Sequence, residues 1–134
     1  MPYLIGYIAV LISFAAVDAI WLSLMGPRLY KPTLGDILLT DLRIGPAIAF
    51  YLIYPVGLLA FAVLPGLKSG SPATVIGSGA LFGAIAYATY DLTNYATLRN
   101  WTLQLTVLDI VYGAAASALA AFVSLLVVRA ISNA

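Results

Sequence analysis

Four long apolar stretches decide what this chain can fold into. Each contains about 20 or more mostly apolar residues, the length that an α-helix needs to cross the hydrocarbon core of a bilayer. They run over residues 3–25, 44–64, 73–95 and 102–128. Charged residues make up only 8% of the 134 residues, whereas soluble domains carry about 25%. The sequence therefore predicts an all-α membrane protein, a single domain over residues 1–134 with four transmembrane helices in an antiparallel bundle.

Glycine and proline mark the expected ends of these helices. Gly26-Pro27 is expected to end the first helix and Pro65-Gly66 the second, while 70-GSP-72 begins the third. Pro55 lies inside the second helix and is expected to kink it. The N-terminal stretch lacks a basic leading region and a convincing cleavage site, so we expect it to remain as the first span.

A longer segment, 26-GPRLYKPTLGDILLTDLR-43, joins the first two helices. It mixes leucines with charged side chains, a pattern typical of a short amphipathic piece that lies at the membrane surface. The alternative is an ordinary polar loop that happens to contain leucines. We expect the short interfacial segment.

Lysine and arginine in short loops favour the cytoplasmic side of a membrane. One side of the predicted bundle holds four of these residues and the other holds two. The first set is Arg28, Lys31, Arg43 and Arg99, and the second is Lys68 and Arg129. We therefore expect a multi-pass protein of the bacterial inner membrane with both termini in the periplasm.

The chain contains no cysteine, no histidine and no glutamate. Thiol chemistry, disulfides and the commonest metal ligand are thereby excluded. We expect no cofactor, and in particular no haem or zinc site. All acidic chemistry rests on five aspartates, which are Asp18, Asp36, Asp41, Asp91 and Asp109.

Three of these aspartates, Asp18, Asp91 and Asp109, fall inside predicted spans. At 1.5 Å per residue, each lies within ~5–11 Å of the same membrane face. A carboxylate that faces lipid costs up to ~2.5–3.5 kcal/mol, so these side chains are expected to face inward. Burial and mutual repulsion both favour protonation, so at least one proton should be shared unless a cation enters.

Small residues share helix faces with these acids, and small residues let membrane helices approach closely. On the third helix this face contains Gly77, Ala80, Ala84, Tyr87, Asp91 and Asn94, and on the fourth it contains Asp109, Gly113, Ala116 and Ala120. We predict a polar, cytoplasm-facing pocket. Its expected lining is Asp18, Tyr54, Tyr87, Asp91, Asn94, Asp109 and Arg43, with Arg99 as an alternative cation. Trp21, Tyr95 and Trp101 are interpreted as an interfacial belt.

Several motifs together resemble a family of small bacterial inner-membrane proteins known as domain of unknown function 2177. They are D-x-x-W from Asp18, F-Y-x-x-Y-P at 50–55, YATYDLTN at 87–94 and W-x7-D-x-x-Y-G from Trp101 to Gly113. The resemblance spans essentially the whole chain. One departure is Tyr112, where the family pattern has tryptophan. The resemblance implies a four-helix membrane protein and no established activity.

These observations leave several functions open. The first is binding or transport of a small molecule, lipid or cation, for which a homodimer would be needed to complete a transport path. The alternative is an accessory or structural subunit of a larger membrane complex. Instead of forming a ligand site, the acids could belong to a purely structural hydrogen-bond network. A second alternative is an intramembrane enzyme acting on lipid, with Asp91 or Asp109 assisted by Tyr87 or Tyr90. Because few reacting groups are available, we expect a role without catalysis and no nucleic-acid partner.

Overall fold

The computed structural model describes residues 2–39 and 43–132, and these residues form helices joined by short turns. Within these ranges, four helices are long and apolar enough to cross a membrane. They are Pro2–Ile37, Ile44–Ser69, Pro72–Thr97 and Leu103–Ser132. The predicted membrane fold is therefore confirmed.

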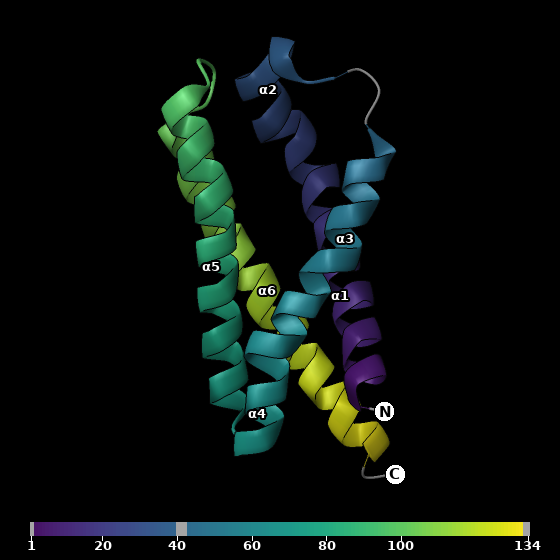
Figure 1. Cartoon of the computed structure of the whole chain (residues 1–134). Helices are drawn as coiled ribbons and strands as arrows, with labels where there is room; N and C mark the ends of the chain where they lie inside the picture. The colour runs from purple at the N-terminus through teal and green to yellow at the C-terminus, as the bar shows by residue number, and fades with distance from the viewer. Residues whose placement is uncertain (1, 40–42, 133–134) are drawn as a thin grey trace.

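The spanning helices alternate in direction, so that both chain ends lie at one end of the bundle (Figure 1). The segment after α1 (Pro2–Met25) and the connection from α5 (Pro72–Thr97) to α6 (Leu103–Ser132) lie at the other end. α6 is central, because it packs most extensively against α5 and next against α1. Polar side chains on α6 are thus within reach of both neighbours.

The first helix does not end at Gly26-Pro27, which corrects the expectation from the sequence. α1 passes directly into a π-helical turn, η1 (Gly26–Tyr30). The short helix α2 (Lys31–Leu34) and the 3-10 turn η2 (Gly35–Ile37) then follow without a gap. The residues after the proline are therefore an extension of the first span.

Pro27 provides a physical reason for the π turn. Proline has no N–H, and its ring would collide with the carbonyl of Ser23 in a regular α-helix. A π turn is wider, and here the N–H of Lys31 donates to the carbonyl of Gly26, five residues back. The helix thus passes the proline and ends its regular path only at Gly35, where φ is 36°, a value that strongly favours glycine.

The second helix also runs past its predicted end at Pro65-Gly66. α3 (Ile44–Leu58) continues through a π turn, η3 (Leu59–Val63), into α4 (Leu64–Ser69). Pro65 is accommodated in the first turn of α4, where its missing N–H matters little. The helix ends at Gly70, which has the left-handed conformation (φ 72°) common after helix ends. Pro55 lies inside α3, and the π turn starts four residues later.

The third helix begins where the sequence predicted. The Oγ atom of Ser71 accepts a hydrogen bond of 3.2 Å from the N–H of Thr74, and Pro72 occupies the first turn. Both features are standard signals of a helix start. α5 and α6 extend to Thr97 and Ser132, somewhat beyond the predicted ends.

Small residues bring α5 and α6 together, as expected, but not all at the predicted positions. Gly113, Ala116 and Ala120 on α6 are buried, which confirms the predicted face of that helix. On α5 the buried glycines are Gly79 and Gly83. Gly77, predicted to lie on this face, is exposed, with open space around it. The contact face of α5 is therefore rotated relative to the prediction.

The connecting segment covers one end of the bundle. Leu29 and Leu34 are buried in a small cluster with Trp101, which precedes α6, and Leu105 in its first turn. Ile37, Leu38 and Leu39 are exposed. The segment is amphipathic, as predicted. Residues 40–42, which include Asp41, lie outside the described residues, and the position of the segment relative to a membrane stays a prediction.

Candidate functional site

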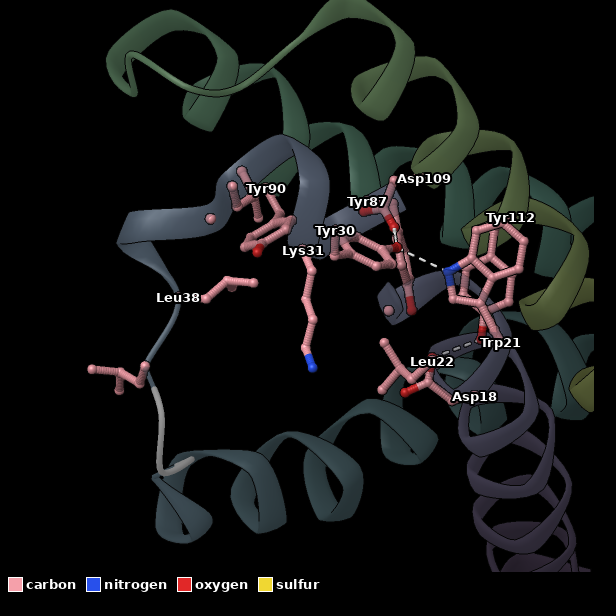
Figure 2. A pocket seen from close by; sticks show the side chains of 14 residues that line it. Asp18, Trp21, Leu22, Tyr30, Lys31, Leu38, Tyr87, Tyr90, Asp109 and Tyr112 are labelled. Atoms are coloured by element: carbon pink, nitrogen blue, oxygen red, sulfur yellow. Dashed lines mark hydrogen bonds between the residues drawn. The ribbon is translucent and has the colours of Figure 1, made fainter. Parts of the chain in front are cut away.

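A cavity of about 810 Å³ lies beneath the connecting segment, between α1, α5 and α6 (Figure 2). Its lining combines acidic, aromatic and aliphatic side chains with one lysine. The lining residues are Asp18, Trp21, Leu22, Gly26, Tyr30, Lys31, Leu34, Gly35, Leu38, Leu39, Tyr87, Tyr90, Asp109 and Tyr112. This cavity is the candidate functional site.

Two tyrosines from different helices hold the carboxyl group of Asp18. The hydroxyl of Tyr112 on α6 donates to Asp18 Oδ1 at 2.7 Å, and the hydroxyl of Tyr51 on α3 donates to Asp18 Oδ2. Asp18 is only 7% exposed. Hydroxyl donors of this kind compensate a buried carboxylate for the water that it has lost. The side chain therefore ties α1 to both α3 and α6.

A second chain of hydrogen bonds ends at Asp109. The Nε1–H of Trp21 donates to the hydroxyl of Tyr30 at 2.8 Å, and that hydroxyl donates to Asp109 Oδ1. The ring of Trp21 also stacks on Tyr112, with centroids 4.2 Å apart and planes 12° from parallel. Because Tyr112 bonds to Asp18, Trp21 physically links the surroundings of the two carboxyl groups.

The π turn is what brings Tyr30 to Asp109. Tyr30 is the last residue of η1, the π turn that contains Pro27. Such turns are frequent at functional sites, because the extra residue redirects the side chains that follow. Lys31 comes next, and its side chain extends across the cavity in Figure 2.

Asp91, on α5, lies beside Asp109. It is fully buried, and its nearest acidic neighbour is Asp109. Among the described residues, neither carboxyl oxygen of Asp91 has a hydrogen-bond partner. This differs sharply from Asp18 and Asp109, both of which accept hydrogen bonds from tyrosines.

Aromatic rings form much of the cavity wall. They are Trp21, Tyr30, Tyr87, Tyr90 and Tyr112. The faces of such rings carry partial negative charge and attract cations. The remaining lining is mostly leucine, which suits an apolar group. The cavity can therefore hold a molecule with a charged end and an apolar end.

The structure brings together only part of the predicted pocket. Asp18, Tyr87 and Asp109 line the cavity, and Asp91 lies one layer behind it. The three carboxyl groups do not meet at a single point: Asp18 has its own tyrosine partners, whereas Asp91 and Asp109 are neighbours. Consistent with this, no three acidic side chains in the described ranges are grouped closely enough to share a metal ion.

The other predicted pocket residues lie elsewhere. Tyr54 is buried nearer the bundle centre, where its hydroxyl is 2.7 Å from Ser117 Oγ. Asn94 is half-buried, about one turn beyond Asp91, and is not among the lining residues. Arg43 and Arg99 are exposed and do not line the cavity.

The two tryptophans contact other parts of the protein, and their position at a membrane interface stays a prediction. Trp21 lines the cavity, and Trp101 is only 5% exposed, with its Nε1–H donating to Thr106 Oγ1 at 3.1 Å. Tyr95, by contrast, is 43% exposed. Both indole rings are held inside the protein because each has a hydrogen-bond acceptor there.

Sequence reasoning also missed three tyrosines that bind the acids. Tyr112 lies three residues after Asp109, so helical spacing alone placed it beside the pocket. Tyr51 lies three residues before Tyr54, which was predicted, and could have been found in the same way. Tyr30 gave no such signal, because it follows a Gly-Pro pair that usually ends a helix.

A family model described as "Predicted membrane protein (DUF2177)" matches residues 3–126. The chain belongs to this family. The DUF2177 match extends from α1 through most of α6 and includes every residue that lines the cavity. No curated protein and no solved structure matches the chain significantly. Membership in DUF2177 confirms the resemblance seen in the motifs and names no activity.

Proposed function

We propose that this membrane protein binds a small amphipathic molecule with a positively charged head. The observation that carries the proposal is the lining of the cavity, where two buried carboxyl groups and five aromatic rings surround a space of about 810 Å³. The head would lie between Asp18 and Asp109. The apolar part would lie against the leucines of α1 and the connecting segment.

Charge favours a cation over an anion at this site. The lining contains two carboxyl groups and one ammonium group, that of Lys31. Attraction between charges is much stronger in a poorly solvated site than in water. The rings of Trp21 and Tyr112 would add a cation–π contribution of about 0.5–2 kcal/mol.

Binding fits one chain better than a complete transport path does. The cavity lies entirely in the half of the bundle that the connecting segment covers. The cavity does not continue through the bundle, because its lining stops short of the buried core, which includes Phe14, Leu58, Ala120 and Leu125. Transport of the ligand would require a second copy of the chain or a rearrangement of the helices.

The alternative of an accessory subunit has less support. Its basis was the small-residue faces of α5 and α6, which could have served a partner. In the described residues, Gly79, Gly83 and Gly113 are instead occupied by the packing of α5 against α6. A ligand-binding role uses the cavity, for which the subunit role offers no reason.

The binding experiment uses the full chain in lipid nanodiscs and tetraphenylphosphonium as the probe, a bulky apolar cation. Tetraphenylborate has the same shape and the opposite charge, so it tests the sign preference. In a Trp101→Phe background Trp21 is the remaining tryptophan, and its fluorescence reports on the cavity. We expect the cation, but not the anion, to change this fluorescence saturably, with empty nanodiscs as the blank.

Asp109→Asn tests the role of the carboxyl group. We expect it to weaken the affinity for tetraphenylphosphonium at least tenfold, equivalent to about 1.4 kcal/mol. Asp36→Asn is the matched control, because Asp36 is exposed and does not line the cavity. Equal affinities for the cation and the anion, or equal effects of the two substitutions, would refute the proposal.

We further propose that the protein lies in a bacterial inner membrane with both termini in the periplasm. The distribution of basic residues supports this, since four of the six lie at the connecting-segment end of the bundle. The chain has no cysteine, so single cysteines can report the topology. In intact cells a membrane-impermeant maleimide should label Ser69→Cys, and it should label Asp36→Cys only after permeabilisation. The reverse pattern would contradict this orientation.

A further inference from the structure

We propose that Asp91 and Asp109 form a proton-binding pair that releases one proton when the cation enters the cavity. The inference rests on the proposed function, and it assigns a role to Asp91, which the binding site itself does not use. Asp91 is fully buried and has no hydrogen-bond donor among the described residues, and it lies beside a second carboxyl group.

An ionised Asp91 would be very costly in this position. A buried charge without a partner or a donor loses its hydration and gains nothing in return. The titratable groups that act on Asp91 are Asp109 from α6, Tyr30 from η1 and Tyr90 from α5 itself. All three are acids, and the ammonium group of Lys31 lies in the cavity lining, which includes Asp109 but not Asp91. In the empty protein Asp91 therefore holds a proton.

Asp109 connects that proton to the cavity. It is the neighbour of Asp91 on one side and part of the cavity lining on the other. When a cation enters, the O–H bond of Asp91 breaks and the proton passes to the carboxylate of Asp109. From there it leaves to water in the cavity. Asp109 then faces the bound cation as a carboxylate, with the ionised Asp91 beside it and outside the cavity lining.

Charge balance makes this exchange favourable. One positive charge enters and one proton leaves, so the total charge of the site is unchanged. If the cation bound without release of the proton, one carboxyl group would remain neutral. The electrostatic attraction between the cation and the site would then be weaker. Affinity for the cation should therefore rise with pH, by up to about tenfold per pH unit for a single exchanged proton.

The experiment measures proton release directly. The full chain in nanodiscs, in weakly buffered solution near neutral pH, receives tetraphenylphosphonium while a pH-indicator dye records released protons. We expect about one proton per bound cation. Asp91→Asn should retain binding, release no proton and show an affinity that no longer depends on pH. Asp36→Asn is the matched control and should behave like the parent protein.

Infrared spectroscopy of the unmodified protein provides a second measurement that does not depend on any variant folding. The carbonyl stretch of a protonated carboxylic acid should be present in the empty protein and should disappear when tetraphenylphosphonium binds. Binding without proton release or loss of this band overturns the exchange and leaves the proposed function intact. Absence of binding overturns the proposed function and the exchange with it.

Discussion

The two halves of the bundle are built in opposite ways. Near the chain ends the helices meet through small residues: Ser124 Oγ donates to the carbonyl of Gly6 at 2.9 Å, and a methyl group at Gly79 would lie 3.1 Å from the Cα of Ala118. Near the connecting segment, large aromatic side chains stand between the helices instead, and a cavity remains. Small residues at facing positions thus allow α6 to approach α1 and α5 closely near the chain ends, whereas large side chains line a cavity near the connecting segment.

Gly83→Ala should produce the largest loss of stability, because it disturbs the close packing of α5 against α6. The added methyl group would lie 2.4 Å from the carbonyl oxygen of Gly113 and about as close to Ser117. We expect a loss of about 2–3 kcal/mol, measured by denaturant unfolding in detergent micelles. Gly77→Ala is the matched control: it meets open space and should change stability by less than about 0.5 kcal/mol. Equal losses would mean that α5 and α6 do not pack through this face.

Asp18→Ala should cost about 2 kcal/mol, since it removes the acceptor that ties three helices together in the open half. The hydroxyls of Tyr51 and Tyr112 would lose their common partner. Asp91→Asn is the comparison, and it should cost much less because the carboxyl group of Asp91 accepts no hydrogen bond from the described residues. The same unfolding assay measures both variants, and a larger loss for Asp91→Asn would reverse this picture of the two acids.

Tyr30→Phe should have the smallest effect, about 1 kcal/mol, typical of one lost hydrogen-bond chain. It removes the donor to Asp109 and the acceptor of Trp21. In the Trp101→Phe background we expect the emission of Trp21 to shift to longer wavelength, because its indole becomes more mobile and better hydrated. Tyr95→Phe changes an exposed ring and serves as the control. An unchanged spectrum would show that the connecting segment does not hold Trp21 in place.

The membrane fold could be read from the sequence because hydropathy and length act on whole segments. The ends of the helices were harder to predict near the prolines. Pro27 and Pro65 were expected to stop helices, but a π turn continues the chain at Pro27, and Pro65 is accommodated in the first turn of α4. A single sequence shows where a regular helix is unfavourable, but not whether a wider turn will replace it.

The candidate site was half predictable for a related reason. Asp18 and Asp109 could be placed because charge in hydrocarbon must face inward, and both line the cavity. Tyr30 could not, because its position depends on the turn at Pro27. The hydrogen bonds of the tryptophans were not foreseen, because an indole ring suits either an interface or a buried site with an acceptor.

The π turn at Gly26–Tyr30 has a mechanical consequence. Such a turn contains one residue more than an α-helical turn, so its conversion to α geometry would rotate everything beyond it by about 100° around the helix axis. Tyr30 would move away from Asp109, and residues 31–39 of the connecting segment would turn with it. A change of geometry at this one turn would therefore alter how the connecting segment covers the cavity.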